Sequence, residues 1–482
     1  MDGCKRLSAS HPPPDTTQTM GHDHDYDCSF VTDVVTEGRV STAEDVLDAH
    51  AKDEGPHEAH RPDVVVWPDS TREIAALLAE ANDRTVPVTP WSGGTSIEGN
   101  PIPVAGGIVL NTSEFDEITV RHDDLQAVVG PGVVYDDLNA ALASHNLRFA
   151  PGIAAGDIAT IGGMIANNAS GLNAVRYGVT GDHVLRLEVV LPDGRIIECG
   201  RDVPKSTAGY NLKDLFVGSE GTLGVITEAT LSLEGIAQHR HAALVTFPSS
   251  VAASQAVSTI MASGLTPGAL EFMDTQLVEL LNDYNDDADF PAAPLLLIEL
   301  HGNSGDLSTQ MDRVRTICED HDAIEWSEAD TDDIETIWRA RRDAYPAACE
   351  YYADQTVGVI GDVVVPISRY PDIVSRIETI SDELELLTPC VGHAGDGNIH
   401  FLPVVDTDDP AAMDRVQELT DAIVSEALEL GGTATGEHGI GIGKRKFMRQ
   451  EHGDAVDVMS GIKDAIDPRG IMNPGKTLPN DD

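Results

Sequence analysis

The chain has 482 residues, of which 41% are hydrophobic, and it carries 31 Lys+Arg against 81 Asp+Glu, a formal net charge of −50. This charge excludes nucleic acid and anionic membrane surfaces as natural partners, because both would repel the protein. The length and apolar content predict a folded protein of two or three domains rather than a disordered chain.

The six cysteines stand far apart, and no Cys-x-x-Cys pair occurs among them. Neither a disulfide framework nor an iron–sulfur ligation pattern can be read from such spacing. The sequence also lacks an apolar run of about 18 residues and a signal-peptide core. We therefore predict a cytoplasmic protein with reduced thiols and no transmembrane segment.

The first part of the chain contains a leader followed by alternating helices and strands. Residues 1–30 are predicted to be disordered, since they combine a proline run with polar repeats. A capping box at residues 41–44 predicts a short helix, and Val64-Val65-Val66 predicts a buried strand. A second capping box at residues 70–73 begins an amphipathic helix, which a strand at 86–88 follows.

Three glycine-rich stretches come next in the chain. They are Ser92-Gly93-Gly94-Thr95-Ser96, then Pro151-Gly152 with residues 160–171, and finally residues 218–226. Small residues let a long, flat ligand lie against bare backbone N–H groups, although any one stretch alone would be an ordinary turn. No Gly-x-Gly-x-x-Gly opens a helix, so a dinucleotide would not be bound in the Rossmann manner.

Beyond about residue 231, amphipathic helices alternate with short strands, of which 295–300 and 357–366 are two. This pattern predicts a second α+β domain, built on an antiparallel sheet. Asp409-Pro410 is a cap and first-turn pair, and it begins a helix that Gly431-Gly432 ends.

Residues 389–402 carry the most informative chemistry of the chain. Asp396-Gly397 predicts a two-residue type I′ turn, because both central residues of that turn need positive φ. In that register His393 lies opposite His400, and Asn398 projects from the same face. Directly opposed Cβ atoms are about 4.5–5.5 Å apart, close enough for two imidazoles to share one metal ion.

Two histidines in a hairpin are by themselves most often surface residues. Residues 436–439 add a carboxylate, Glu437, and a third imidazole, His438. Two histidines and a glutamate form the ligand set of an open, catalytic metal site. The two motifs together therefore favour a metal centre.

With these motifs in view, residues 60–235 resemble the flavin-binding domain of the vanillyl-alcohol oxidase family. The loops at 93–96, 160–171 and 218–226 match, in order, its pyrophosphate, isoalloxazine and adenine-side contacts. Four residues match its branch of metal-assisted D-2-hydroxyacid dehydrogenases, namely His393, His400, Glu437 and His438.

Within that branch, residues 361–369 are similar to the FAD-dependent, cytochrome-type D-lactate dehydrogenases. Glycolate oxidase flavoprotein subunits and D-2-hydroxyglutarate dehydrogenases share the other motifs. In the latter group a lysine grips the second carboxylate, and the residue aligned with it here is Ile360, which argues against a dicarboxylate substrate.

The resemblance implies an α+β fold, a two-domain vanillyl-alcohol-oxidase-type flavoprotein. Its parts would be an FAD-binding α+β domain (31–235), an antiparallel-sheet substrate or cap domain that carries the metal hairpin (236–430), and a C-terminal segment (431–482). That segment would complete the active site and return to the FAD domain. The FAD contacts implied by the motifs are Ser92, Gly93, Gly94, Thr95, Ser96, Pro151, Gly152, Thr160, Gly162, Gly163, Asn167, Ser170, Gly171, Glu220, Gly221, Gly224 and Ile226.

The resemblance also implies a role for each polar residue. The metal, zinc or manganese with iron as an alternative, would be bound by His393, His400 and Glu437. His438 would be the general base, although a fourth-ligand role stays open, and Asn398 would hydrogen-bond the substrate. Arg341 aligns with the arginine that binds the substrate carboxylate, and Arg339 and Arg342 are its alternatives. The α-hydrogen would leave as hydride to flavin N5, and a carbanion route would use the same residues.

FAD is expected to be bound non-covalently, because residues 91–99 and 151–171 contain no His or Cys. The expected partners are a small 2-hydroxyacid and an electron acceptor, which could be a quinone, a cytochrome, an electron-transfer flavoprotein or an Fe–S protein. A homodimer stays open. A metal-dependent hydrolase is the remote alternative, since hydrolysis gives no reason for three nucleotide-type loops.

The charge of −50 also predicts a halophilic protein whose melting temperature rises with salt over the molar range. Screening shortens the reach of carboxylate repulsion from about 10 Å at 0.1 M salt to about 3 Å at 1 M. Thermal unfolding in dilute buffer and in molar KCl measures the effect, and equal melting temperatures would contradict the halophilic interpretation.

Overall fold

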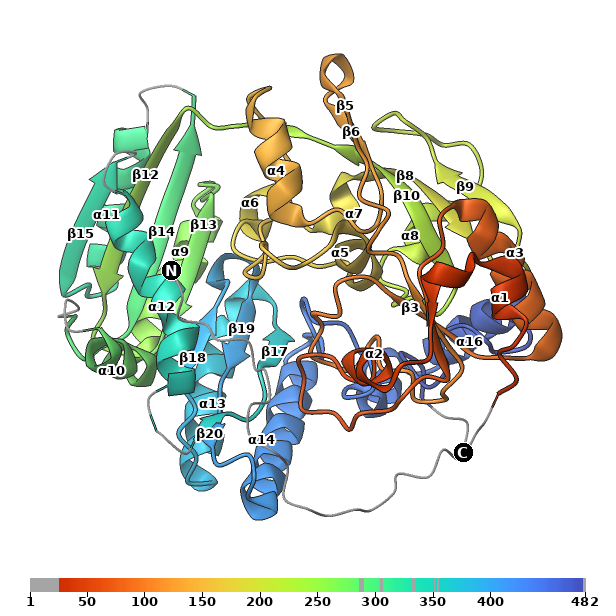
Figure 1. The fold of residues 1–482 in the computed structure, drawn as a ribbon. Helices are drawn as coiled ribbons and strands as arrows, with labels where there is room; N and C mark the ends of the chain where they lie inside the picture. Colours follow the sequence, from red (N-terminus) through yellow and green to blue (C-terminus); the bar gives the residue numbers. More distant parts are fainter. Residues whose placement is uncertain are drawn as a thin grey trace.

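The computed structural model describes residues 26–479 except 286–289, 304–306, 331–333, 351 and 353–354. Residues 1–25 of the predicted leader lie outside the described part. In Figure 1 the red segments near residue 50 and the dark-blue helix near residue 460 lie together on the right, and the green strands between residues 239 and 330 lie on the left. No described helix is both long enough and apolar enough to cross a membrane.

The N-terminal domain begins with a four-stranded sheet in which β2, β4 and β3 are parallel. Its strands, in spatial order, are β1 (Val40–Ser41), β2 (Val64–Val66), β4 (Ile108–Asn111) and β3 (Val88–Trp91). The predicted strand at 86–88 therefore lies slightly later in the chain. All three valines of β2 are buried, as a parallel strand covered on both faces requires.

The second predicted helix has the predicted cap, whereas the first does not. Ser70 Oγ accepts a hydrogen bond from the Glu73 backbone N–H at 3.3 Å and so caps α3 (Thr71–Arg84). By contrast, α2 (Glu44–Ala49) has Ala43 at its N-cap and no side-chain cap. The predicted capping box at 41–44 is wrong, because the Ser41 hydroxyl accepts from the Ala43 backbone N–H instead.

A five-stranded antiparallel sheet completes the N-terminal domain. Its strands, in spatial order, are β5 (Ile118–Arg121), β6 (Gln126–Val129), β10 (Val225–Ser232), β8 (Val184–Val190) and β9 (Ile196–Gly200). Val190 and Val225 of this sheet pack in one apolar cluster with Ile74 and Leu77 of α3. The helix α3 therefore joins the two sheets through a shared core.

The second domain is built on a seven-stranded sheet whose neighbouring strands are all antiparallel. In spatial order they are β15 (Glu325–Asp330), β12 (His239–Thr246), β14 (Leu295–Gly302), β13 (Ala269–Met273), β18 (Cys390–Gly392), β19 (Asn398–Phe401) and β17 (Gly361–Val364). The predicted strand at 357–366 is divided between β16 (Thr356–Val357) and β17.

Helices cover both faces of this sheet, since its strands alternate their side chains between two cores. Leu296 and Ile298 pack with the helices of one face, and Leu295 and Leu297 pack on the other side. The first face carries α9 (Ser250–Ala262), α11 (Leu307–Asp320), α13 (Tyr370–Glu383) and α14 (Pro410–Glu429). The second carries α10 (Thr275–Tyr284) and α12 (Ile334–Glu350).

The hairpin that contains the two histidines differs from the predicted register. Val391, not His393, lies opposite His400 in the ladder between β18 and β19. The predicted pairing is therefore wrong. His393 nevertheless stays beside its partner, because it lies just beyond the end of β18, and the two ring centroids are 5.3 Å apart.

The turn itself explains the difference in register. Residues 394–396 form a 3₁₀ turn, and Gly397 follows with φ of 88°. Asp396 avoids the positive φ that a type I′ turn would demand of an L-residue. Its carboxylate instead accepts from the Asn398 backbone N–H at 3.2 Å. The loop between the strands is consequently longer than predicted.

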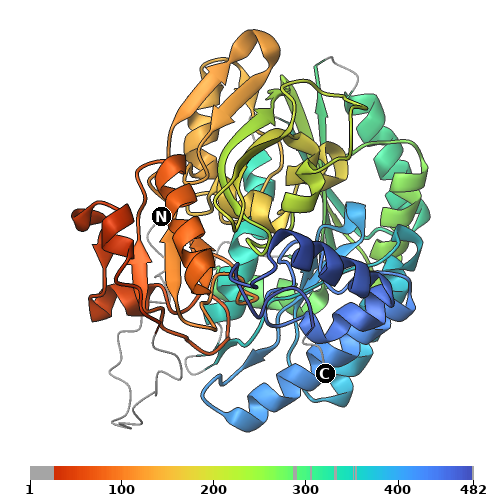
Figure 2. The same ribbon diagram turned by 90° about the vertical axis from the view of Figure 1, so that its right-hand side faces the viewer.

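The C-terminal residues lie against the N-terminal domain. The Val88 backbone N–H donates to the Ile471 carbonyl, and the Asn473 backbone N–H donates to the Val88 carbonyl, both at 2.8 Å. From α16 (Ala455–Ile466), Lys463 donates to the Thr222 carbonyl at 2.7 Å. Figures 1 and 2 show this helix close to the first sheet.

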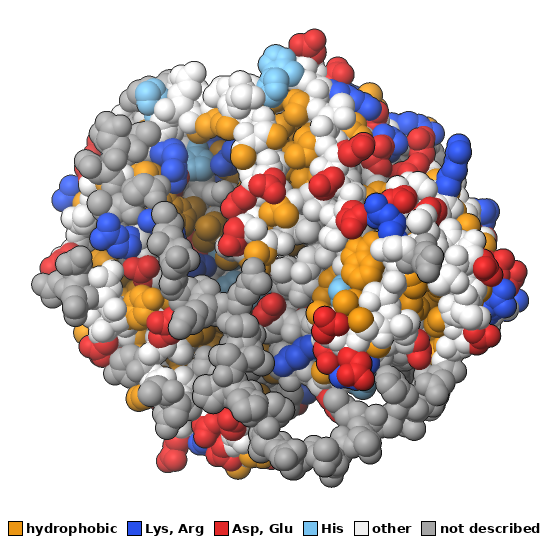
Figure 3. All heavy atoms as spheres, viewed as in Figure 1, with side chains coloured by type: hydrophobic (Ala, Val, Ile, Leu, Met, Phe, Trp, Pro, Cys, Tyr) orange, Lys and Arg blue, Asp and Glu red, His pale blue; other side chains and the backbone are white. Residues whose placement is uncertain are grey.

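The surface agrees with the composition. Figure 3 shows acidic side chains scattered over the described part of the viewed face, with lysines and arginines between them. Carboxylates that face water in this way are hydrated individually, and their mutual repulsion depends on the salt concentration.

Candidate active site

The three residues predicted as metal ligands converge at one point. The ligand atoms of His393, His400 and Glu437 all lie within 4.8 Å of one another. His393 Nε2 is 3.3 Å from Glu437 Oε1, and His400 Nε2 is 3.8 Å from Glu437 Oε2. Two strand-end histidines and one loop carboxylate thus face a common centre, although they come from distant parts of the chain.

A buried glutamate orients the first of these histidines. The sequence gives no local signal of this pairing, because the two residues are 122 positions apart. Glu271 on β13 is fully buried and accepts from His393 Nδ1 at 2.8 and 2.9 Å. This bond turns Nε2 toward Glu437, as a carboxylate behind a metal-binding histidine does. Burial opposes the charged imidazole, but Glu271 and Glu437 together raise the pKa of His393 well above its usual value. The site therefore favours a positive charge.

The second histidine is held neutral by its surroundings. Burial lowers the pKa of His400 to about 4, in spite of the nearby carboxylates of Glu437 and Asp362. Its Nδ1 is buried and has no hydrogen-bond partner among the described residues. A neutral imidazole is the form that binds a metal ion.

Glu437 and His438 lie in a loop that one buried aspartate holds in place. Asp362 on β17 is fully buried. Its Oδ2 accepts from three successive backbone N–H groups, those of Gly436 (2.8 Å), Glu437 (2.9 Å) and His438 (3.3 Å), and from Thr435 Oγ1 (2.8 Å). Burial opposes ionisation, but His438 and Lys444 keep the pKa of Asp362 well below its usual value. No local sequence signal marks this role of the aspartate, because its partners in the loop lie more than 70 residues away.

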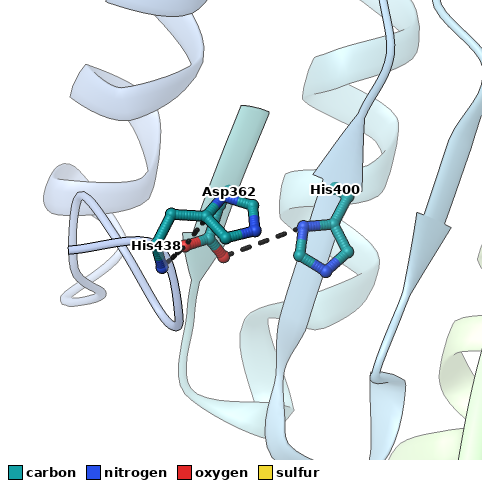
Figure 4. A group of neighbouring side chains, drawn as sticks. All are labelled: Asp362, His400 and His438. Carbon is teal, nitrogen blue, oxygen red and sulfur yellow. Dashed lines mark hydrogen bonds and ion pairs between the residues drawn. The ribbon is translucent and has the colours of Figure 1, made fainter. Parts of the chain in front are cut away.

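Asp362, His400 and His438 form a second cluster, which Figure 4 shows around the carboxylate. Its imidazole nitrogens are 3.9 Å and 3.8 Å from the carboxylate oxygens. This aspartate already accepts several hydrogen bonds, and the ammonium group of Lys444 lies 3.9 Å from it. A cation would have to displace these donors, so the cluster serves as an anchor and is a poor metal site.

His438 and Asn398 both lie against Asp362. His438 Nδ1 faces the carboxylate, and its ring stacks on His400 with centroids 5.3 Å apart. Asn398 Nδ2 donates to Asp362 Oδ1 at 2.6 Å, whereas its Oδ1 is buried without a partner among the described residues. The free group of Asn398 is thus an acceptor, which suits a substrate hydroxyl and not a substrate carboxylate.

Arg341 is the arginine of its helix that points inward. Its Nε donates to Glu271 Oε2 at 2.8 Å, and its side chain is 13% exposed. Arg339 and Arg342, the alternatives, are exposed. Glu271 therefore contacts both the predicted carboxylate-binding residue and a predicted metal ligand.

The glycine-rich loops supply open backbone donors. Within the described chain, the backbone N–H groups of Gly93, Gly94, Thr95 and Ser96 make no hydrogen bond to another residue. Unpaired donors of this kind suit the phosphates of a dinucleotide. Gly171 packs so tightly against the loop that contains Gly152 that an added Cβ would lie 2.3 Å from the Gly152 carbonyl oxygen.

The remaining predicted FAD contacts divide into two groups. Thr160 caps α5 (Ile161–Asn167). The other end of this helix approaches the loop that contains Glu437 and His438: Asn167 donates to the His438 carbonyl at 3.3 Å, and Ser170 Oγ donates to Glu437 at 3.4 Å. Gly162 and Gly163 lie in the first turn of α5. The others lie in loops or on β10, and are Ser92, Pro151, Gly221, Gly224 and Ile226.

Glu220, also predicted as an FAD contact, has its carboxylate committed elsewhere. It accepts from the backbone N–H groups of Ile440 (2.7 Å) and Gly441 (2.8 Å) and from Asn100 Nδ2 (2.6 Å). Its side chain thus holds the C-terminal loop against the N-terminal domain. No local sequence signal marks this role, because the two backbone partners lie more than 200 residues away and Asn100 lies 120 residues away.

Comparisons with known proteins agree with this geometry. Residues 62–200 match the FAD binding domain family, and residues 236–477 match the C-terminal domain of FAD linked oxidases. A probable mitochondrial D-lactate dehydrogenase of Danio rerio is 38% identical, with 91% of this chain and 89% of that protein covered. The glycolate oxidase subunit GlcD of Bacillus subtilis is 36% identical (90% and 92% covered), and a D-lactate dehydrogenase of Archaeoglobus fulgidus is 34% identical (86% and 91% covered).

Solved structures share the fold at low sequence identity. Alkyldihydroxyacetonephosphate synthase superposes with a TM-score of 0.74 at 19% identity, with 94% of this chain and 86% of that chain covered. p-Cresol methylhydroxylase gives 0.75 at 16% identity, with 93% and 95% covered. The fold and the loops define a two-domain α+β flavoprotein of the vanillyl-alcohol oxidase type, as the sequence predicted. The chain belongs to the FAD-linked oxidases, in the group that contains D-lactate dehydrogenases and glycolate oxidase subunits, and it is an FAD-dependent oxidoreductase.

The anchoring role of Asp362 can be tested by replacing it with asparagine. Asp362→Asn places an amide N–H₂ among backbone N–H donors and removes one of the two carboxylates that lie beside Lys444. We expect the free energy of unfolding to fall by about 3–5 kcal/mol, the usual cost of breaking a buried charged network. Chemical denaturation measures the loss.

Asp202→Asn is the matched control. Like Asp362, Asp202 is a carboxylate with cationic partners, in its case Arg121 and Arg186, but its side chain is 36% exposed. It should cost less than about 1 kcal/mol. Equal losses for the two variants would contradict the special role of Asp362.

Proposed function

We propose that the protein is an FAD- and metal-dependent dehydrogenase that oxidises a D-2-hydroxyacid, with D-lactate the first choice, to the 2-oxoacid. The observation that carries the proposal is the meeting of two sites: the group of His393, His400 and Glu437, and the inward-pointing Arg341, which shares Glu271 with it. A 2-hydroxyacid presents a hydroxyl and a carboxylate side by side, and these two sites match that pair.

The residues fit a divalent metal ion in number and in charge. Two imidazoles and a carboxylate converge, and His400 is neutral. Burial opposes ionisation of Glu437, but His393 lowers the pKa of this carboxyl to about 2, so that it is ionised. Zinc and manganese accept this ligand set, and iron is the alternative. When bound, the ion polarises the substrate hydroxyl and lowers its pKa.

The chain's own residues then divide the remaining work. Arg341 binds the substrate carboxylate through its terminal nitrogens, since its Nε is occupied by Glu271. Asn398 Oδ1 accepts from the hydroxyl. His438 takes the hydroxyl proton at the ring nitrogen that faces away from Asp362, and the carboxylate behind it stabilises the imidazolium. FAD, when bound, supplies N5 as the hydride acceptor.

Electrons must then leave the flavin for an acceptor other than NAD. The six cysteines show no iron–sulfur pattern, so the acceptor is a separate quinone, cytochrome, electron-transfer flavoprotein or Fe–S protein. The Danio rerio and Archaeoglobus fulgidus relatives, both named D-lactate dehydrogenases, support the choice of substrate.

A second candidate is a glycolate oxidase flavoprotein subunit, which the 36% identical GlcD of Bacillus subtilis favours. Comparing kcat/KM for D-lactate and glycolate with an artificial dye separates the two. D-2-Hydroxyglutarate is disfavoured, because the apolar Ile360 stands where a lysine would bind the second carboxylate.

We expect the purified protein to be yellow and to release its flavin on acid precipitation, because residues 91–99 and 151–171 offer no His or Cys for a covalent bond. Absorbance of the supernatant and the pellet near the flavin maximum measures the partition. Flavin retained by the pellet would show a covalent link and overturn the non-covalent assignment.

The metal ligands and the base should be separable by mutation. His393→Ala, or chelation, should abolish flavin reduction by D-lactate and leave FAD bound, because the cofactor loops contribute no metal ligand. His438→Asn should retain the metal and lose turnover by about 10²–10⁴-fold, the usual contribution of a general base. Elemental analysis beside anaerobic stopped-flow reduction measures both effects.

His122→Asn, at an exposed histidine, controls for loss of an imidazole as such. Loss of metal in His438→Asn would make His438 a ligand and overturn this division of roles. Normal flavin reduction by the chelated enzyme would overturn metal dependence.

A further inference from the structure

Glu271 lies between the two recognition groups and has no catalytic role in the scheme above. It sits near the middle of the seven-stranded sheet, on β13, and is fully buried. Both of its carboxylate oxygens are within 2.9 Å of His393 Nδ1, and Oε2 is also 2.8 Å from Arg341 Nε. One rigid carboxylate therefore holds a proposed metal ligand on one side and the proposed carboxylate-binding arginine on the other.

Arg341, the second partner of Glu271, is held in one orientation by their hydrogen bond. Arg341 Nε is the atom that Glu271 accepts from, and no other hydrogen bond of this side chain is formed within the described chain. Its two terminal nitrogens are consequently free for a bidentate carboxylate contact.

We infer that Glu271 is a positioning residue that sets the distance between the hydroxyl-binding metal and the carboxylate-binding Arg341, and thereby selects 2-hydroxyacids over 3-hydroxyacids. This inference rests on the proposed function. A 3-hydroxyacid has one more carbon between its two groups, so it cannot reach both sites while Glu271 keeps them together. Misplacement of a reacting group by about 1 Å can cost about 10²-fold in rate, which is enough to produce such selectivity.

The neighbouring strand carries a matched unit that makes a control. Glu299 on β14 is also buried, and it binds His301 Nε2 and Arg240 Nε, both at 2.5 Å. Each unit thus joins a histidine and an arginine through one buried glutamate. Neither His301 nor Arg240 belongs to the proposed metal site. Glu299 also accepts a hydrogen bond from Trp338 Nε1 of α12, and the amide oxygen of a glutamine can keep this contact. Glu299→Gln therefore tests the cost of neutralising a buried glutamate without removing a contact of the recognition groups.

The decisive experiment compares Glu271→Gln, Glu271→Asp and Glu299→Gln in the flavin-loaded enzyme. Metal content is measured together with kcat and KM for D-lactate and for D-3-hydroxybutyrate. In Glu271→Gln, one amide oxygen and one amide N–H₂ face two N–H donors, so one contact must break. We expect metal affinity to fall about 10–100-fold, as for other supporting partners of metal ligands. The preference for D-lactate over D-3-hydroxybutyrate in kcat/KM should fall at least about tenfold.

Glu271→Asp keeps the charge and shortens the side chain by one methylene, so it should bind metal and still lose selectivity. It decides the matter if Glu271→Gln does not fold. Glu299→Gln should lower the melting temperature while its metal content and selectivity remain those of the wild type.

The inference is overturned if the folded Glu271 variants keep both the wild-type metal affinity and the wild-type selectivity, or if Glu299→Gln loses selectivity equally. Failure of the proposed function looks different: the wild-type enzyme itself would then not reduce its flavin with D-lactate.

Discussion

The active site depends on how one short loop is held between two domains. Residues 435–441 contain no helix or strand, and five of their seven backbone N–H groups donate to two buried carboxylates. Asp362, from the sheet of the second domain, takes the donors of residues 436–438, and Glu220, from the N-terminal domain, takes those of residues 440 and 441. Because a buried N–H without an acceptor is costly, the loop has one favourable position, and Glu437 and His438 are placed by it.

The buried charged groups around that loop likewise need partners. Buried carboxylates persist only when cations or hydrogen-bond donors surround them, and here each has a specific partner. Lys444 illustrates the arrangement, since it is almost fully buried and its ammonium group reaches both the Asp362 carbonyl oxygen (3.0 Å) and the carboxylate of Glu98 (3.2 Å) in the N-terminal domain. The interior therefore neutralises its charges in pairs, whereas the acidic surface leaves that task to water and salt.

This arrangement also explains how one helix can serve recognition. On α12, Trp338 and Arg341 are three residues apart and so lie on one face. Trp338 contacts Glu299 of β14 and Arg341 contacts Glu271 of β13, and both contacts attach the helix to the sheet. Arg341, the residue proposed to bind the substrate carboxylate, is thereby fixed by packing as well as by charge.

The sequence by itself determined the local features. Glycine-rich loops, the Ser70 cap and the alternation of helix and strand are readable from neighbouring residues, because turn chemistry and periodicity act over a few positions. The proposed ligand trio of His393, His400 and Glu437 was also predicted from short motifs, since two of its members lie in one hairpin and residues 436–439 supply the third. The family resemblance added the two-domain architecture.

Tertiary structure alone decided what stands behind those residues. Glu271 reaches His393 across 122 residues, and Asp362 reaches the 436–438 loop across more than 70. A lone Glu or Asp in a strand carries no local signal of such a partner. The register of the hairpin was likewise misread, because the positive φ that a type I′ turn demands of Asp396 competes with its hydrogen bond to Asn398. Local rules thus identify which groups bind, while burial and long-range pairing decide how those groups are aimed, because the cost of a buried, unpaired charge is felt only once the chain has folded around it.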